Sequence, residues 1–141
     1  MTISAAPVSE VAGYVVAIRT IEFFQATEQV DEDHVRQLAR TIHLQGHWLA
    51  PMPIESSTGL VMDGNHRLQA ARLLGLRRLP CIPLHYGDRR VAVRCWRSNL
   101  PFDTRRVLSL ASGRELLPFK TTRHRFDPPL PQSHIPIALL A

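Results

Sequence analysis

The feature that most constrains the fold is an apolar run that leads through a glycine loop into a helix. Residues 60–62 are apolar, the polar loop Asp63-Gly64-Asn65 follows, and apolar side chains then recur at helical spacing until Gly75. Free backbone N–H groups at the start of a helix, together with the helix dipole, form a site for an anion. Gly64 lets the backbone approach such a ligand closely. The segment therefore predicts an α/β fold with an anion-binding loop.

The residues of this loop suit a phosphate group. His66 and Arg67 add side-chain donors to the backbone of Gly64 and Asn65, and Arg67 is able to bind phosphate through two parallel hydrogen bonds. Asp63 ends the predicted strand, where its carboxylate would hold Mg²⁺ against the phosphates. A polar turn explains the same residues, with Asp63 as a helix cap and Arg67 as a solvated side chain. The spacing by itself leaves both interpretations open.

The rest of the chain predicts short strands and amphipathic helices. We expect helices between Asp31 and Gly46, over residues 66–74, and after Asp103 or Thr104, and we expect strands over residues 14–18, 52–54, 60–62, 79–84 and 91–96. Prolines at positions 80 and 83 favour an edge or irregular position for the strand over residues 79–84. The summed pattern predicts an α/β (α+β) fold, a single small domain with a mixed sheet flanked by helices.

The composition changes after Phe126. Four prolines lie between residues 128 and 136, in a stretch without helical periodicity. We expect a nucleotide-binding domain over residues 1–125 and a Pro-rich C-terminal tail over residues 126–141. Within this tail, residues 135–140 are either frayed or docked on the body of the protein or on a partner.

The charge of the chain favours an anionic partner. Lys and Arg number 17 against 12 Asp and Glu, which suits a nucleotide, a phosphorylated metabolite or nucleic acid, although a merely basic surface gives the same excess. The apolar runs are too short to span a membrane, and residues 1–7 lack the pattern of a signal peptide. We therefore expect a cytoplasmic protein with no membrane partner, in which Cys81 and Cys95 are free thiols.

The stretch from Val35 to Leu84 resembles the ParB/sulfiredoxin-type domain. The resemblance lies in the first predicted helix, in Gly46, in residues 51–54, and in the run GLVMDGNHRLQAARLLGLRRLPCIPL. It implies a small α/β domain that binds nucleotide phosphates through residues 64–67. Sulfiredoxins need a cysteine immediately before the His-Arg pair, and Asn65 stands there in this chain. Chromosome-partitioning ParB proteins bind CTP and DNA and need a helix-turn-helix region after this domain; we expect no such helix pair in the residues after Leu84, which hold one clear helix and a proline-rich stretch.

Three further segments resemble the free-serine kinases of this superfamily. EQV at residues 28–30 precedes the first helix, where those kinases carry a catalytic glutamate, VRCWR at residues 93–97 is similar to their tryptophan strand, and GRELLPFKTTRH at residues 113–124 is similar to their substrate segment. Two positions depart from the pattern: Asn65 stands where a second histidine or a similar polar residue is expected, and Cys95 stands where a serine is common.

The resemblance implies phosphorylation of free L-serine to O-phospho-L-serine, with ATP or ADP as the donor and Mg²⁺ as the metal. It implies that Glu28 and Asp63 are catalytic: Glu28 takes the proton of the serine hydroxyl, and Asp63 with Mg²⁺ orients the transferred group. We expect substrate contacts from Trp96, Lys120, Thr121, Thr122, Arg123 and His124. The alternative is a ParB-like nucleotide- and DNA-binding regulator without kinase activity, in which residues 120–124 form a basic surface run.

Overall fold

The structure is a computed structural model in which residues 9–113 and 115–141 are described; residues 1–8 of the predicted domain and Arg114 of the predicted substrate segment lie outside the described residues. Its centre is a mixed sheet of four strands in the order β1-β2-β5-β4. The strands are β1 (Ser9–Val11), β2 (Tyr14–Thr20), β5 (Arg78–Leu84) and β4 (Met52–Glu55). Strand β2 is antiparallel to β1 and β5, whereas β4 is parallel to β5.

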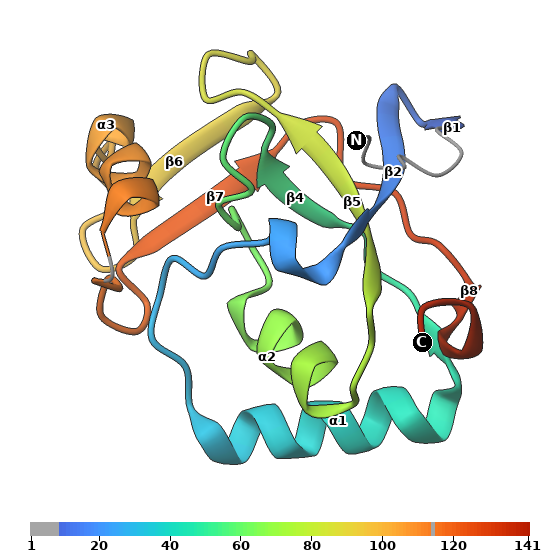
Figure 1. The fold of residues 1–141 in the computed structure, drawn as a ribbon. Helices are drawn as coiled ribbons and strands as arrows, with labels where there is room; N and C mark the ends of the chain where they lie inside the picture. The colour runs from blue at the N-terminus through green and yellow to red at the C-terminus, as the bar shows by residue number, and fades with distance from the viewer. Residues whose placement is uncertain (1–8, 114) are drawn as a thin grey trace.

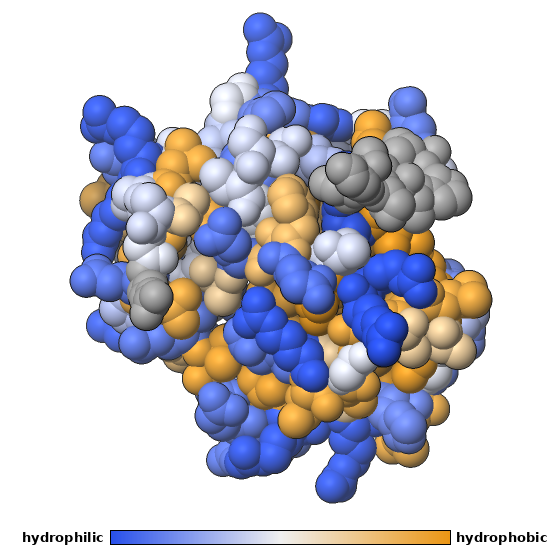
Figure 2. Space-filling view, in the orientation of Figure 1, coloured by the Kyte–Doolittle hydropathy of each residue, from blue (hydrophilic) through white to orange (hydrophobic). Residues whose placement is uncertain are grey.

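Two helices pack on one side of this sheet, as Figure 1 shows. They are α1 (Glu32–Gln45) and α2 (Asn65–Leu73), and the one-turn helix η1 (Ile21–Phe23) follows β2. The arrangement confirms the predicted α/β class. Figure 2 shows hydrophilic and apolar side chains interspersed over the face of the molecule that is seen in Figure 1. Within the described ranges, no helix is long and apolar enough to cross a membrane.

The residues that follow β5 in sequence form a second, smaller layer. Strands β6 (Val91–Cys95) and β7 (Thr122–Phe126) form an antiparallel pair, and α3 (Thr104–Leu108) with η2 (Ser109–Ser112) lies between them in sequence. Figure 1 shows this pair and α3 set to one side of the central sheet. Strand β3 (His47–Trp48) pairs with β8 (Ile135–Pro136), and η3 (Ile137–Leu139) follows.

Helix α1 forms for the reasons that its sequence predicts. The Asp31 side chain caps it by accepting hydrogen bonds from the backbone N–H groups of Asp33 (3.0 Å) and His34 (3.4 Å). Gly46 ends it in the left-handed conformation, with φ of 75°. The buried side chains are Val35, Ala39 and Ile42.

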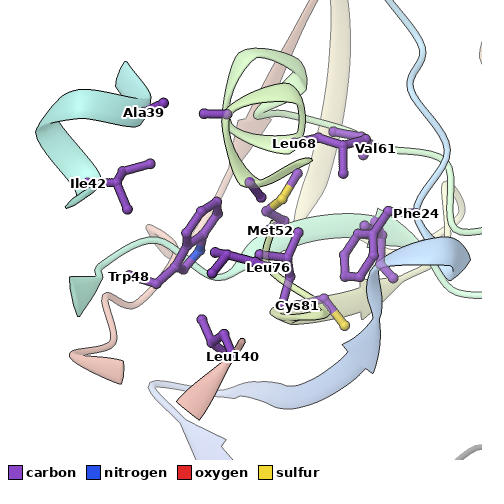
Figure 3. Close-up of a cluster of buried hydrophobic side chains, with 14 of the residues drawn as sticks. Phe24, Ala39, Ile42, Trp48, Met52, Val61, Leu68, Leu76, Cys81 and Leu140 are labelled. Atoms are coloured by element: carbon purple, nitrogen blue, oxygen red, sulfur yellow. The ribbon is translucent and has the colours of Figure 1, made fainter. Parts of the chain in front are cut away.

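The main core lies between the helices and the sheet, and it includes the end of the chain. In Figure 3, Trp48, Met52, Leu68 and Leu140 meet in one apolar cluster. Leu140 is fully buried, and its carbonyl oxygen accepts hydrogen bonds from the N–H groups of residues 77 and 78. Of the two arrangements that the sequence left open for residues 135–140, the structure has the docked one.

One predicted strand is absent and another is present at a position that was not expected, and hydrogen bonding explains both differences. Leu60 and Val61 form isolated bridges rather than a strand, because they bond to two different segments: Val61 N–H donates to Gln25 and Leu60 accepts from Glu55. Strand β5 is central, not an edge. Its ladder with β2 covers residues 78–81 and its ladder with β4 covers residues 81–84, so each proline lies outside one of the two ladders.

The inner face of β7 contains a histidine whose protonation should destabilise the fold. The His124 ring hydrogen-bonds the Tyr86 hydroxyl (3.0 Å) and stacks on Phe126, and burial lowers the pKa of His124 to about 4. In the unfolded chain this pKa is about 6.5. Between these two values the unfolded state binds more protons, so stability is fully present above pH 6.5 and falls as the pH drops towards 4.

We therefore expect His124→Gln to lose less stability on acidification than the parent. The difference should be roughly 2–3 kcal/mol between pH 7 and pH 4.5, because each pKa unit corresponds to about 1.4 kcal/mol. Urea unfolding of both proteins at the two pH values measures it. Identical acid sensitivities would mean that His124 is not the group responsible.

Candidate active site

A cleft of about 420 Å³ opens where α2 begins. Four parts of the chain line it: the segment before and within α1, the start of α2, the turn after β6, and the segment leading into β7. The lining residues that the sequence had singled out are Glu28, Asp63, Gly64, Asn65, His66, Arg67, Trp96, Lys120 and Thr122. The fold thus brings together one glutamate, one aspartate and the predicted phosphate loop.

The start of α2 has the geometry of an anion site. Gly64 has φ of 106°, a conformation that L side chains rarely adopt, and a Cβ there would lie 3.3 Å from the Met52 side chain. The first hydrogen bond of the helix runs from Leu68 N–H to the Gly64 carbonyl oxygen (2.9 Å). The N–H groups of residues 65–67 precede that bond, so the helix itself provides no acceptor for them.

Most of the hydrogen-bonding capacity of the Asn65 side chain is used within the protein. Its Oδ1 accepts hydrogen bonds from the backbone N–H groups of Thr27 (2.8 Å) and Glu28 (3.2 Å), and its Nδ2 donates to Thr27 Oγ1 (3.1 Å). Thr27 is buried, and its hydroxyl donates to the Val61 carbonyl oxygen (2.8 Å). The backbone N–H of Asn65 and the second hydrogen of its Nδ2 have no acceptor among the described residues, so both remain for the predicted phosphate contact.

The His66 ring accepts a hydrogen bond in its neutral form, and its other nitrogen has no hydrogen-bond partner within residues 9–113 and 115–141. Its Nε2 accepts a hydrogen bond from Asp31 N–H (3.1 Å), so the proton of the neutral ring is on Nδ1. The ring centroids of His34 and Phe119 lie 4.5 Å and 5.5 Å from its own. Burial, and then the nearby His34, lower the pKa of His66, which extends the range of the neutral form.

Asp63 and Arg67 face solvent at the mouth of the cleft. Among the described residues neither side chain has an ion-pair or hydrogen-bond partner. Arg67 also borders a second cavity of about 210 Å³, which shares Leu38 with the cleft and is lined by Thr41 of α1 and Trp48 of β3. One cation therefore lies between the two hollows.

The Glu28 carboxylate also lines the cleft, where it is hydrogen-bonded to Thr122. Glu28 Oε2 accepts hydrogen bonds from Thr122 N–H (2.9 Å) and from Thr122 Oγ1–H (2.6 Å). The backbone on both sides of Glu28 bridges to Leu117, which donates to the Thr27 carbonyl oxygen and accepts from Gln29 N–H (both 2.9 Å).

Cationic side chains surround Trp96. Lys120 Nζ lies 5.3 Å and Arg123 Cζ lies 5.2 Å from the centre of the indole ring, within the range of a cation–π interaction. Trp96 is 41% exposed. Lys120 lines the cleft, whereas Arg123 reaches Trp96 from outside it.

Three predicted substrate residues are not brought to the cleft. Thr121 donates its hydroxyl to the Pro118 carbonyl oxygen, Arg123 is on the outer face of β7, and His124 packs against Tyr86. Conversely, the sequence analysis did not single out the cleft residues Gln29, His34, Leu38, Met62 and Phe119. His34 and Phe119 contact His66 only through the tertiary fold, so no local pattern marks them.

Comparison with known proteins agrees with this fold. The family model of the ParB N-terminal domain matches residues 4–100. The chain belongs to the ParB N-terminal domain family. An ATP-dependent L-serine kinase of Desulfurococcus mucosus is 29% identical over 93 residues, and a ParB-like protein of Sulfolobus acidocaldarius is 35% identical over 48 residues. These matches cover 63% and 34% of this chain but only 36% and 24% of the relatives' own lengths.

Solved structures share the fold over almost the whole chain. A conserved hypothetical protein from Pyrococcus furiosus superposes with a TM-score of 0.80 at 14% identity, covering 96% of this chain and 100% of its own. Free serine kinase in complex with AMP superposes with a TM-score of 0.79 at 13% identity, covering 100% of this chain and 97% of its own. A variant of free serine kinase in which a glutamate is replaced by alanine, in complex with ADP, superposes with a TM-score of 0.81 at 12% identity, covering 100% of this chain and 98% of its own. At such identities these likenesses establish the architecture.

The Asn65 contacts make a stability prediction. Asn65→Ala leaves the N–H groups of Thr27 and Glu28 without their acceptor, which should cost about 1–3 kcal/mol. Asn65→Asp keeps the acceptor for both N–H groups, while it removes the donor to the Thr27 hydroxyl and adds a negative charge near Glu28; we expect its loss to be smaller than that of Asn65→Ala. Urea unfolding at neutral pH ranks the two variants, and an unchanged Asn65→Ala midpoint would show that these bonds contribute nothing.

Proposed function

We propose that this protein is a small-molecule kinase that transfers a phosphoryl group from ATP or ADP to free L-serine, giving O-phospho-L-serine. The observation that carries the proposal is that Glu28 and the helix start at residues 64–67 line one cleft, so a base and an anion site face the same space. The L-serine kinase among the relatives, and the free serine kinases with AMP or ADP among the fold neighbours, support it.

In this reaction the serine hydroxyl oxygen forms a bond to the terminal phosphorus of the nucleotide. The bond between that phosphorus and the bridging oxygen breaks, so ATP leaves as ADP, or ADP leaves as AMP. The hydroxyl proton passes to the Glu28 carboxylate, which acts as the general base. Phosphoryl transfer depends mainly on positioning and charge neutralisation, which a fixed cleft provides.

The nucleotide would lie across the start of α2. Its phosphates would accept hydrogen bonds from the N–H groups of residues 65–67, from His66 Nδ1–H and from Arg67. The nucleoside would extend past Arg67 into the second cavity, where Leu38, Thr41 and Trp48 offer a mainly apolar lining.

The residues present fit a magnesium ion that is held mainly by the nucleotide. Asp63 offers an unpaired carboxylate at the cleft, and the described part of the chain has no group of three or more metal-binding side chains. Mg²⁺ is commonly bound by one or two carboxylates together with phosphate oxygens and water. When bound, it would neutralise phosphate charge. Lys120, the cleft cation beside Trp96, would pair with the serine carboxylate or the transferred group.

The second candidate is a ParB-like regulator that binds nucleotide and nucleic acid. The observation in its favour is that Arg94 and Arg123 lie directly opposite each other in the β6–β7 pair, with Arg125 on the same face. Like charges in this arrangement are unfavourable unless an anion approaches them. A gel-shift assay with duplex DNA at several salt concentrations tests this candidate.

One assay tests the kinase directly. The protein is incubated with Mg²⁺, ATP or ADP, and each free amino acid in turn, and products are followed by ³¹P NMR. Phosphoserine formed only with serine supports the proposal. Absence of any phosphorylated amino acid, together with salt-dependent DNA binding, would replace it with the regulator.

We predict that Glu28→Gln lowers turnover by about 10²–10⁴-fold, the usual effect of losing a general base. Glutamine keeps the size of the side chain and an oxygen for the Thr122 donors, so nucleotide affinity should change less than a few-fold. Glu32→Gln, at the exposed start of α1, is the matched control. Steady-state kinetics and calorimetry separate the two effects, and full activity in Glu28→Gln would assign the base elsewhere.

We predict that Arg67→Ala weakens nucleotide binding by about 10- to 100-fold, because charge-assisted hydrogen bonds to phosphate contribute about 1.5–3 kcal/mol. The fold should be retained, since Arg67 is exposed and makes no ion pair within the described residues. Arg40→Ala on the exposed face of α1 controls for loss of net charge. Calorimetric titration with ADP measures the affinities; equal values for all three proteins would refute the phosphate assignment.

A further inference from the structure

We infer that Thr122 is a positioning residue that orients the Glu28 carboxylate, and not a contact for the substrate as the sequence suggested. The inference rests on the proposed function, in which Glu28 is the base. Thr122 provides two hydrogen-bond donors, its backbone N–H and its hydroxyl, and both end on the same oxygen, Glu28 Oε2.

The two hydrogen bonds make the two oxygens of the Glu28 carboxylate different. Oε2 is occupied by donors at 2.9 Å and 2.6 Å, both in the range of charge-assisted hydrogen bonds. Oε1 receives no hydrogen bond from residues 9–113 or 115–141. Because its lone pairs are unoccupied, Oε1 is the atom that takes the serine proton. The Thr122 hydroxyl has given its only proton to Glu28, so it has no donor left for a ligand.

The backbone fixes both members of this pair. Leu117, five residues before Thr122, hydrogen-bonds to the residues on either side of Glu28, so the base loop and the segment leading into β7 are joined. On the other side, Trp96 N–H donates to the Thr121 carbonyl oxygen (3.0 Å). A glutamate side chain has three rotatable bonds, and the contacts with Thr122 restrict them before substrate arrives.

A positioning role and a substrate-binding role predict different kinetics. If Thr122 orients Glu28, loss of its hydroxyl lets the carboxylate rotate, which lowers kcat and leaves the KM for serine nearly unchanged. Small misplacements of a catalytic group reduce rates by about 10- to 100-fold. If Thr122 instead contacted serine, the same loss would raise KM.

The test compares Thr122→Val, which keeps the shape and the backbone N–H but removes the hydroxyl, with Thr122→Ser, which keeps the hydroxyl. We expect Thr122→Val to lose about 10-fold or more in kcat, with KM for serine and the ADP dissociation constant within about 3-fold. Thr122→Ser should keep most of the kcat of the parent protein, because it keeps the hydroxyl. Thr104→Val, at the start of α3 outside the cleft, is the control for a Thr-to-Val change.

A double variant decides whether the effect passes through Glu28. With Gln at position 28 the base is already lost, so adding Thr122→Val should lower the residual kcat by less than about 2-fold. A full additional loss in the double variant, or a rise in KM without a fall in kcat, would overturn the inference and leave the kinase proposal standing. A parent protein that forms no phosphoserine would overturn the proposed function and the inference with it.

Discussion

The hydrogen bonds of the Asn65 amide are the interaction on which the site depends. The predicted base and the predicted phosphate loop belong to segments almost forty residues apart in sequence, and Asn65 Oδ1 joins them by accepting from Thr27 and Glu28 N–H. The other half of the amide bonds the buried Thr27 hydroxyl, which donates to Val61 at the entrance of the loop. These bonds join the base loop to the phosphate loop, so the distance between base and phosphate site is set by the fold.

His66, the residue after Asn65, joins α2 to a second segment, the start of α1. His66 Nε2 accepts from Asp31 N–H, and the Asp31 side chain caps α1. The first turn of α2 therefore binds the base loop through Asn65 and the start of α1 through His66, while the N–H groups of residues 65–67 have no acceptor among the described residues. Phosphoryl transfer requires little covalent chemistry from a protein and much accurate placement. A cleft whose walls are already hydrogen-bonded to one helix end suits that requirement.

Local sequence signals made the helix boundaries around the site predictable. Asp31 and Gly46 bound α1, and Gly64 marks the turn into α2, because caps and left-handed glycines act within a few residues. Long-range features were not predictable. The inner face of β7 carries Thr122 and His124 before Phe126, so the apolar alternation of a usual strand is absent. The roles of Asn65 and Thr122 depend on partners 38 and 94 residues away, which spacing within a loop does not reveal.

The cations of the cleft show what the site leaves for a ligand. The Glu28 carboxylate is hydrogen-bonded to Thr122 and forms no ion pair with the cations of the cleft. Arg67 and Lys120 therefore line the cleft without an acidic partner among the residues that the structure describes. The chain has 12 acidic residues, and the described ion pairs place acids beside other basic side chains, for example Asp88 beside Arg90 and Glu55 beside His85. Cations kept free in a concave site raise its affinity for an anion at some cost to the empty protein. A bound nucleotide would recover that cost, and by linkage it should stabilise the folded state as its concentration exceeds the dissociation constant.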